Sequence, residues 1–275
     1  MDISISNIAW NVELDNDIAL LLSKLNIRNI DVAPSKYFPF PHSASTQDVR
    51  LIKEYWLKRG VNIAGMQSLL FGTNGLNVFS NSNIQQEMIL HLTHICRIAQ
   101  QLNAKFLVFG SPLNRDRSHL SDHRANTVAQ RFFSHLGDIA QSYGVTICLE
   151  PNPTCYNCNF MTNSKETASI VKLVNHENIK MQLDVGAMYT NNEDPELIVP
   201  EVAHLIGHIH ISEPRLATLN PDNDYHAMVA PLINKYLADK ILTIEMLTSS
   251  KKATLDEVEE SLKFVKNAYL PEQSL

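Results

Sequence analysis

The feature that most constrains the fold of this sequence is a regular alternation of short apolar runs with longer segments of helical period. Eight such runs are present, and Gly, Pro or Asn residues bound them. A short, continuous apolar run is typical of a strand that is buried on both faces of a parallel sheet. The predicted strands are Ile3–Ile8, Arg28–Ala33, Asn62–Gln67, Lys105–Gly110, Val145–Glu150, Ile179–Asp184, Leu205–Ile211 and Lys240–Glu245.

The segments between these runs have the spacing of amphipathic helices. Apolar residues recur every three or four positions before the second predicted strand, at Leu14, Ile18, Leu21, Leu22 and Leu25. The same spacing precedes the fourth strand, at Ile84, Met88, Leu92, Ile95, Ala99 and Leu102. Two later helices begin with the pattern of a capping box, Asn163 with Glu166 and Thr254 with Glu257.

Strict alternation of strand and helix predicts parallel strands joined by right-handed crossovers. Eight such units predict a closed (β/α)8 barrel, a TIM barrel, for which about 250 residues is typical. A doubly wound open sheet is the alternative, but no GxGxxG turn follows the first run, where a dinucleotide-binding fold would place it. No linker or repeat interrupts the pattern, so we expect a single TIM-barrel domain over residues 1–275.

Charge and cysteine content narrow the class of protein. The 29 acidic residues outnumber the 23 lysines and arginines, and a net charge of −6 gives no bulk attraction for nucleic acid or anionic lipid. The first residues lack a basic n-region, and no apolar run approaches the roughly 18 residues of a membrane span. Four cysteines in a chain of this length do not form a disulfide framework. We expect a cytoplasmic protein with no nucleic-acid or membrane partner, and a homo-oligomer stays open.

Four polar residues lie at the carboxyl ends of the last four predicted strands, where TIM barrels build their active sites. They are Glu150 in LEP, Asp184 in LDVG, His210 in HIHISE and Glu245 in IEM. A single buried Glu or His is usually a hydrogen-bonded structural group. Three carboxylates around one barrel mouth would repel one another, and a divalent cation removes that repulsion. Three carboxylates and one imidazole suit Mn2+, Mg2+ or Co2+ better than a structural Zn2+, although Zn2+ also fits.

These strand ends, together with the opening SISNIAW, resemble the xylose-isomerase-like TIM-barrel sugar phosphate isomerase/epimerase family. The order Glu, Asp, His, Glu and the gaps of 34, 26 and 35 residues are similar to those of the ketose 3-epimerases. The resemblance implies that Glu150, Asp184, His210 and Glu245 bind the metal and that Glu150 and Glu245 are also the catalytic acid/base pair. It assigns the ligand position to His210 and leaves His208 as a structural or supporting residue.

The resemblance implies a reaction on a small sugar or sugar phosphate. The metal polarises a carbonyl, one glutamate removes the neighbouring proton, and an enediolate forms. Return of the proton to the opposite face gives an epimer, and its return to the adjacent carbon gives an isomer. Two other readings stay open: a non-catalytic sugar-binding barrel, and a phosphodiesterase like endonuclease IV, whose three-zinc site is richer in histidine than this sequence.

The substrate-binding pattern departs from that of the ketose 3-epimerases. Ala187 stands where they have a His, and Leu216 stands where they have an Arg, with Arg215 one position earlier. We therefore take the candidate substrate contacts from polar or aromatic residues near the strand ends: Asn7, Trp10, Gln67, Asn152, Arg115, Arg215 and His226. The segments Pro34–Thr46 and Ser68–Phe79 are long enough to be lids. Cys155 and Cys158 form a CxxC without a second pair, which we interpret as incidental.

Overall fold

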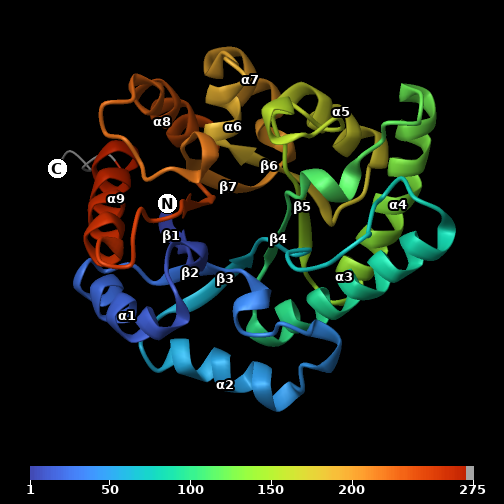
Figure 1. The fold of residues 1–275 in the computed structure, drawn as a ribbon. Helices are drawn as coiled ribbons and strands as arrows, with labels where there is room; N and C mark the ends of the chain where they lie inside the picture. The colour runs from blue at the N-terminus through green and yellow to red at the C-terminus, as the bar shows by residue number, and fades with distance from the viewer. Residues whose placement is uncertain (271–275) are drawn as a thin grey trace.

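All eight predicted strands are present, and they close into a barrel (Figure 1). The computed structural model describes residues 1–270, so the end of the predicted 1–275 domain, residues 271–275, lies outside the described residues. Each strand pairs in parallel with the next one in the chain, and β8 pairs with β1. The strands are β1 Asp2–Ser6, β2 Asn29–Val32, β3 Asn62–Met66, β4 Phe106–Phe109, β5 Thr146–Leu149, β6 Ile179–Asp184, β7 Ile206–Ser212 and β8 Ile241–Glu245.

The helices form a ring around the barrel, as Figure 1 shows. Their apolar faces pack against the strands, which is why the helical period was visible in the sequence. They are α1 Asp15–Lys24, α2 Thr46–Leu57, α3 Ser82–Leu102, α4 Asp122–Ser142, α5 Ser164–Val174, α6 Val185–Thr190, α7 Pro195–Val202, α8 Asp224–Tyr236 and α9 Thr254–Tyr269. Within residues 1–270, no helix combines the length and the apolar character that crossing a membrane requires.

The predicted boundaries differ from the structure at two helix or strand ends. The first strand ends at Ser6, because its hydroxyl accepts a bond from the Ile8 amide and the chain turns into a short 3-10 helix, η1 (Asn7–Ala9). The capping box predicted at Thr254 is wrong: the N-cap of α9 is Ala253, and the Glu257 carboxylate bonds to the Ser249 amide and hydroxyl.

The cap predicted at Asn163 is confirmed. Its side-chain oxygen accepts from the amide of Glu166 at 2.9 Å. The Glu166 carboxylate, however, accepts from the amide of Thr162 at 2.8 Å rather than from that of Asn163. The reciprocal bond is therefore displaced by one residue, and α5 still begins where the pattern indicates.

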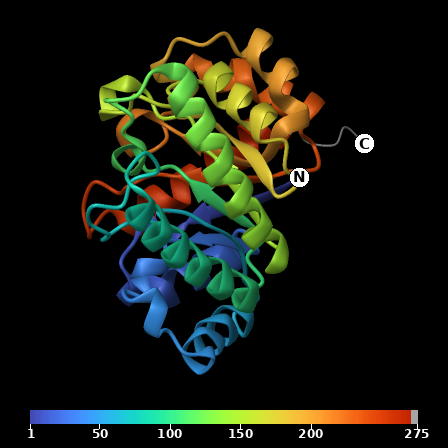
Figure 2. The ribbon, with the colours of Figure 1, turned by 90° about the vertical axis from the view of Figure 1, so that its right-hand side faces the viewer.

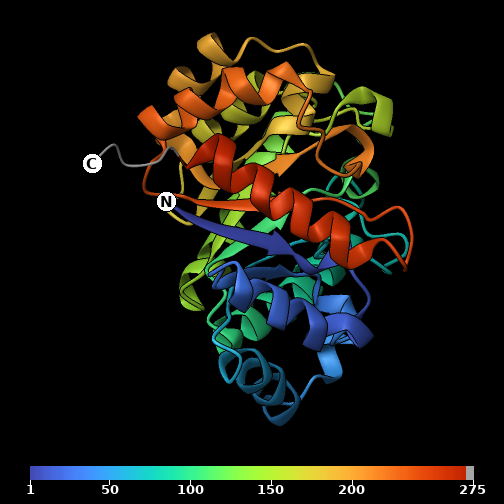
Figure 3. The same ribbon diagram turned by 90° about the vertical axis from the view of Figure 1, so that its left-hand side faces the viewer.

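The carboxyl ends of the strands all point to one end of the barrel. In Figure 3 the blue arrow of β1 runs from the N-terminus toward the side where the long loops gather, and Figure 2 shows the same loops from the opposite direction. Parallel strands in a closed barrel must share this polarity. The residues that end β5, β6, β7 and β8 therefore meet around one mouth.

The interior of the barrel below this mouth contains a buried polar network. The carboxylate of Asp31 accepts from the Ser4 hydroxyl at 3.1 Å and pairs with His208 Nε2 at 2.7 Å, and Thr243 Oγ1 lies 3.1 Å from the same nitrogen. Burial alone would raise the pKa of Asp31, but the His208 imidazole holds it below its usual value. Gly65 leaves room for this carboxylate, since a Cβ there would lie 2.4 Å from Asp31 Oδ2. His208 is thus a structural partner of Asp31.

Candidate metal centre and active site

Four side chains from adjacent strand ends converge at the barrel mouth. Glu150 directly follows β5, Asp184 ends β6, His210 lies in β7, and Glu245 ends β8. Each offers a ligand atom, and these atoms all lie within 4.8 Å of one another. His210 Nδ1 lies 3.1 Å from Glu150 Oε1, 3.2 Å from Glu245 Oε2 and 3.8 Å from Asp184 Oδ2. The convergence expected from the sequence is therefore present.

The electrostatics of this cluster reflect three carboxylates with only one basic partner. Burial raises the pKa of Asp184 well above its ordinary value, and the Glu150 and Glu245 carboxylates raise it further. Burial alone would lower the pKa of His210, but the carboxylates of Glu245 and Glu150 raise it well above its ordinary value. The protein by itself thus holds negative charge here at the cost of a protonated imidazole.

Glu150 is held by residues that follow it and by the loop after β4. Asn152 Nδ2 donates to Glu150 Oε2 at 3.2 Å, and Arg115 donates to the Glu150 carbonyl at 2.7 Å and to the Asn152 side-chain oxygen. Gly110 gives the carboxylate its space, because a Cβ at that position would lie 1.9 Å from Glu150 Oε2. The orientation of Glu150 therefore depends on a missing side chain as well as on two donors.

The other two carboxylates are also fixed. Asp184 is the N-cap of α6: it accepts from the Ala187 amide at 2.5 Å, and its second oxygen accepts from the Ser212 hydroxyl at 3.1 Å. Glu245 Oε1 accepts from Gln67 Nε2 at 2.5 Å. Each carboxylate that faces His210 is thus oriented by a donor outside the cluster, which is typical of ligands held ready for a cation.

The donor set fits a divalent cation. Three carboxylates and one imidazole nitrogen are hard or borderline ligands of the kind that Mn2+, Mg2+, Co2+ and Zn2+ accept. A bound cation would replace the imidazolium as the counter-charge and would remove the mutual repulsion that raises the pKa of Asp184. The cluster is therefore a candidate divalent-metal site.

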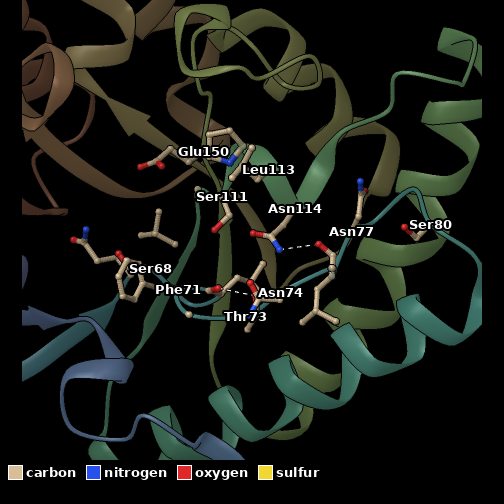
Figure 4. Close-up of a pocket in the computed structure, with 18 of the residues that line it drawn as sticks. Ser68, Phe71, Thr73, Asn74, Asn77, Ser80, Ser111, Leu113, Asn114 and Glu150 are labelled. Atoms are coloured by element: carbon tan, nitrogen blue, oxygen red, sulfur yellow. Dashed lines mark hydrogen bonds between the residues drawn. The ribbon is translucent and has the colours of Figure 1, made fainter.

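Two cavities meet at this cluster. One has a volume of about 570 Å3 and lies between the loop that follows β3 and the loop that follows β4 (Figure 4). The other, of about 510 Å3, lies beside the residues that follow β5, β6 and β7. Glu150 and Glu245 line both cavities. A ligand in either cavity therefore reaches the same two carboxylates.

Comparison with known proteins places the fold in a family. The sequence matches the family described as xylose isomerase-like TIM barrel over residues 21–268. The chain belongs to that family. A search of curated protein sequences finds no significant match.

Solved structures of sugar epimerases share the fold of this family member. A D-psicose 3-epimerase from Clostridium cellulolyticum H10, solved with D-tagatose, superposes with a TM-score of 0.81 at 15% identity, covering 98% of this chain and 99% of that one. An L-ribulose 3-epimerase gives 0.76 at 17% identity, with 98% and 95% covered. The IOLI protein, solved with a zinc atom, gives 0.73 at 17% identity over the whole of both chains.

Within this xylose isomerase-like barrel, three of the predicted substrate contacts face the cavities. Gln67 lines the larger cavity, and Asn152 and Arg215 line the smaller one. Gln67 and Asn152 also bond to the metal-site carboxylates, whereas the Arg215 side chain is exposed at the rim. The Arg215 backbone amide donates to the Tyr156 hydroxyl at 2.8 Å, in a segment where residue 215 has a positive φ of 59°.

The other four predicted contacts are buried and bonded to protein groups. Asn7 accepts from the Ala33 amide at 2.7 Å, and the Trp10 indole donates to Asp15 at 2.7 Å. Arg115 is fully buried and bonds to Glu150 and Asn152, as described above. His226 lies between the Tyr269 hydroxyl at 2.6 Å and Glu213 Oε1 at 3.2 Å. Their bonds in this structure hold the barrel mouth together, because each links two segments that are distant in the sequence.

The two segments expected to be lids are anchored. Residues 68–77 form one wall of the larger cavity. The 34–46 segment contains two 3-10 helices, η3 (Pro34–Lys36) and η4 (Pro41–Ser43), and Arg97 donates to the carbonyls of Pro41 and Ala44 at 3.1 and 2.9 Å. In the CxxC, Cys155 is exposed and lines the smaller cavity, whereas Cys158 is buried.

Sequence reasoning missed several residues that support the site. Ser212 and Gly110 act on Asp184 and Glu150 respectively, and Asp31 carries the buried network with His208. A signal existed for Asp31 alone, since an acidic residue inside the apolar run Arg28–Ala33 must find a buried partner. Ser212 and Gly110 are ordinary residue types at strand ends, and only the spatial arrangement reveals their contacts.

Proposed function

We propose that this protein is a divalent-metal-dependent sugar or sugar-phosphate isomerase/epimerase. The observation that carries the proposal is the convergence of Glu150, Asp184, His210 and Glu245 at the junction of the two cavities. The shared fold supports the same class, because the neighbours include proteins described as D-psicose and L-ribulose 3-epimerases. The class of chemistry is proton transfer next to a carbonyl.

Glu150, Asp184, His210 and Glu245 would hold the cation. When bound, a divalent cation at this site would polarise a substrate carbonyl and make the neighbouring C–H more acidic. Mn2+, Mg2+ and Co2+ suit the oxygen-rich ligand set, and Zn2+ joins the candidates because a structural neighbour is described with a zinc atom. Asp184 has both oxygens occupied by Ala187 and Ser212, so its role is to bind charge rather than to move a proton.

Glu150 and Glu245 carry the proton-transfer step in this proposal. Both line both cavities, so each reaches a substrate from its own side of the mouth. Asn152 and Gln67 each donate to one carboxylate oxygen and leave the carboxylate in a fixed orientation. One glutamate removes the proton beside the carbonyl, and the resulting enediolate takes a proton back from a carboxylic acid.

Solvent deuterium exchange tests this proposal. The protein with Mn2+ should incorporate deuterium at a carbon next to the carbonyl of a ketohexose or a ketohexose phosphate. Glu150→Gln and Glu245→Gln should each lower this exchange by about 10²–10⁴-fold, because the amide cannot carry the proton. The exposed Glu54→Gln on α2 is the matched control and should exchange as the unmodified protein does.

Circular dichroism and thermal melting establish that both Gln variants are folded. Loss of exchange in a folded variant supports a proton-handling role for that glutamate. Full exchange in both variants would contradict the mechanism even if the metal site is correct. An absence of exchange with every sugar and every one of the four metals would contradict the enzymatic proposal and favour a sugar-binding barrel.

A further inference from the structure

The candidate reaction centre has room on two sides. The larger cavity and the smaller one share Ser68, Gly110 and Pro112 as well as the two glutamates. A cavity of about 570 Å3 lies within the range of roughly 300–1,000 Å3 that encloses a drug-sized ligand. A single hexose is smaller than such a ligand, so one sugar ring at the glutamates leaves the outer part of the larger cavity free.

The lining of the larger cavity is polar but neutral away from the carboxylates. Its only charged lining residues are Glu150 and Glu245, within the described residues 1–270. Elsewhere it offers hydroxyl and amide groups, including those of Ser68, Asn74 and Ser111. In Figure 4 Glu150 and Ser80 lie at opposite ends of this group of side chains. Across the described part of the chain, no lysine or arginine contributes to the lining, so a phosphate would find no cation there.

The walls of this cavity are tied together rather than free to close. The Val78 amide donates to the Asn114 carbonyl at 2.9 Å, and Asn114 Nδ2 donates to the Leu76 carbonyl at 2.8 Å. Gln85 on α3 donates to the Val78 carbonyl at 2.7 Å, and His91 Nε2 lies 2.8 Å from the Leu69 carbonyl. These bonds connect the loop after β3 to both α3 and the loop after β4. The cavity is therefore preformed, which favours a ligand that fills it.

Two large apolar side chains lie at its rim. Phe71 is 74% exposed and Leu113 is 75% exposed, and both line the cavity. Large exposed apolar side chains beside a polar cavity commonly mark a binding surface. A sugar ring has an apolar C–H face that packs on an aromatic ring and hydroxyl groups that bond to Ser and Asn side chains. The combination of Phe71 with Ser68, Asn74 and Ser111 matches a neutral sugar ring.

From these features we infer that the substrate is a ketose that carries a second, neutral sugar unit. The keto sugar lies at Glu150 and Glu245, and the attached unit occupies the larger cavity with one face on Phe71. The inference rests on the proposed isomerase/epimerase function and names its substrate class. It distinguishes a glycosylated ketose from both a free ketose and a ketose phosphate.

The test compares sugars that share the same reacting carbons. Maltulose, lactulose and isomaltulose each carry a hexose on a fructose unit and leave its carbonyl and neighbouring C–H free. Deuterium exchange is measured for these three, for D-fructose and for D-fructose 6-phosphate, with the full chain loaded with Mn2+. At least one disaccharide should exceed both single sugars in kcat/KM by about tenfold, a gain that one aromatic packing contact supplies.

Two variants locate the second unit, and a third is the control. Phe71→Ala should lower kcat/KM for the preferred disaccharide by about tenfold and leave that for D-fructose within about twofold. Asn74→Trp fills the cavity from an exposed position and should discriminate in the same direction. Phe40→Ala removes a phenylalanine of similar exposure, 66%, that lines neither cavity, and should change neither sugar.

The outcomes separate this inference from the function on which it rests. A preference for D-fructose or its phosphate over all three disaccharides overturns the inference and leaves the isomerase/epimerase proposal in place. Equal losses for disaccharide and D-fructose in Phe71→Ala and Asn74→Trp also overturn it, because the cavity would then not hold a separate unit. Exchange with none of the five sugars overturns the inference and counts against the proposed function as well.

Discussion

Gly110 offers the most direct test of how the metal site is built. A methyl group at this position would lie 1.9 Å from Glu150 Oε2 and 2.9 Å from Glu150 Cδ. Ordinary contact begins at about 3.4 Å, so the carboxylate of a Gly110→Ala variant must move by at least about 1.5 Å. That displacement takes Glu150 away from His210 Nδ1, which it approaches to 3.1 Å.

The cost of this displacement should fall on the site and not on the fold. The crowded atom is the end of a flexible side chain, so the free energy of unfolding should change by about 1 kcal/mol or less. Misplacement of a metal ligand or its support typically lowers metal affinity by about 10–100-fold. Misplacement of a catalytic group by about 1 Å lowers turnover by about 10²-fold. Thermal melting measures the change in stability, Mn2+ titration calorimetry measures the metal affinity, and deuterium exchange measures the turnover.

Gly60→Ala is the matched control for Gly110→Ala. Gly60 has a φ of +76° with no atom within 4 Å of the position that a methyl group would take, and it lies between α2 and β3, at the opposite end of the barrel. Alanine there strains the backbone and should lower the free energy of unfolding by about 1 kcal/mol, with no change in Mn2+ affinity. Unchanged Mn2+ affinity and turnover in Gly110→Ala would refute the view that Glu150 binds the cation from its present position.

Three further changes have defined outcomes. His208→Asn should lower the free energy of unfolding by about 1–3 kcal/mol, measured by urea unfolding, because the buried Asp31 loses its imidazole partner; an unchanged stability would contradict the structural role. Cys155→Ser should leave turnover within a few-fold, and a larger loss would show that the exposed thiol at the smaller cavity takes part in the reaction. The pKa values of Asp184 and His210 are raised in the folded protein, so their stabilising contribution is complete below about pH 3.8 and 6.5 respectively and is lost as the pH rises toward each raised value. In EDTA the thermal midpoint should therefore fall as the pH rises through this window, Mn2+ should restore most at the upper end, and an Mn2+ effect that is absent or independent of pH would contradict a shared counter-charge role.

The fold could be predicted because its determinants repeat along the sequence. Eight apolar runs, each too short for a helix and separated by helical spacing, leave few alternatives to a parallel barrel. The boundary errors occurred where one side chain decides the local path. The Ser6 hydroxyl ends β1 early, and the Ser249–Glu257 bonds replace the expected cap at Thr254. Such contacts depend on the rotamer of a single residue and leave no periodic signal.

The four metal-site residues could be predicted for a related reason. Each is a polar residue at the end of a buried strand, and the closure of the barrel fixes where strand ends meet. Their separation in the sequence therefore carries little uncertainty about their proximity in space. Supporting contacts have no such rule: Arg115 was expected to meet a ligand, yet it is fully buried and bonds to the Glu150 carbonyl.

Recognition of the substrate depends on loops whose conformation the strand pattern does not determine. The wall of the larger cavity is set by bonds from Asn114 to Leu76 and Val78, between two loops that are nearly forty residues apart in the sequence. Asn114 is one of several asparagines in these loops, and nothing in the residue type separates one that ties loops together from one, such as Asn74, that faces the cavity. The reaction centre follows from barrel geometry, whereas the substrate class follows from which loop side chains the fold leaves unbonded. Exchange measured with sugars of increasing size therefore tests the loops, and exchange measured in the glutamate variants tests the barrel.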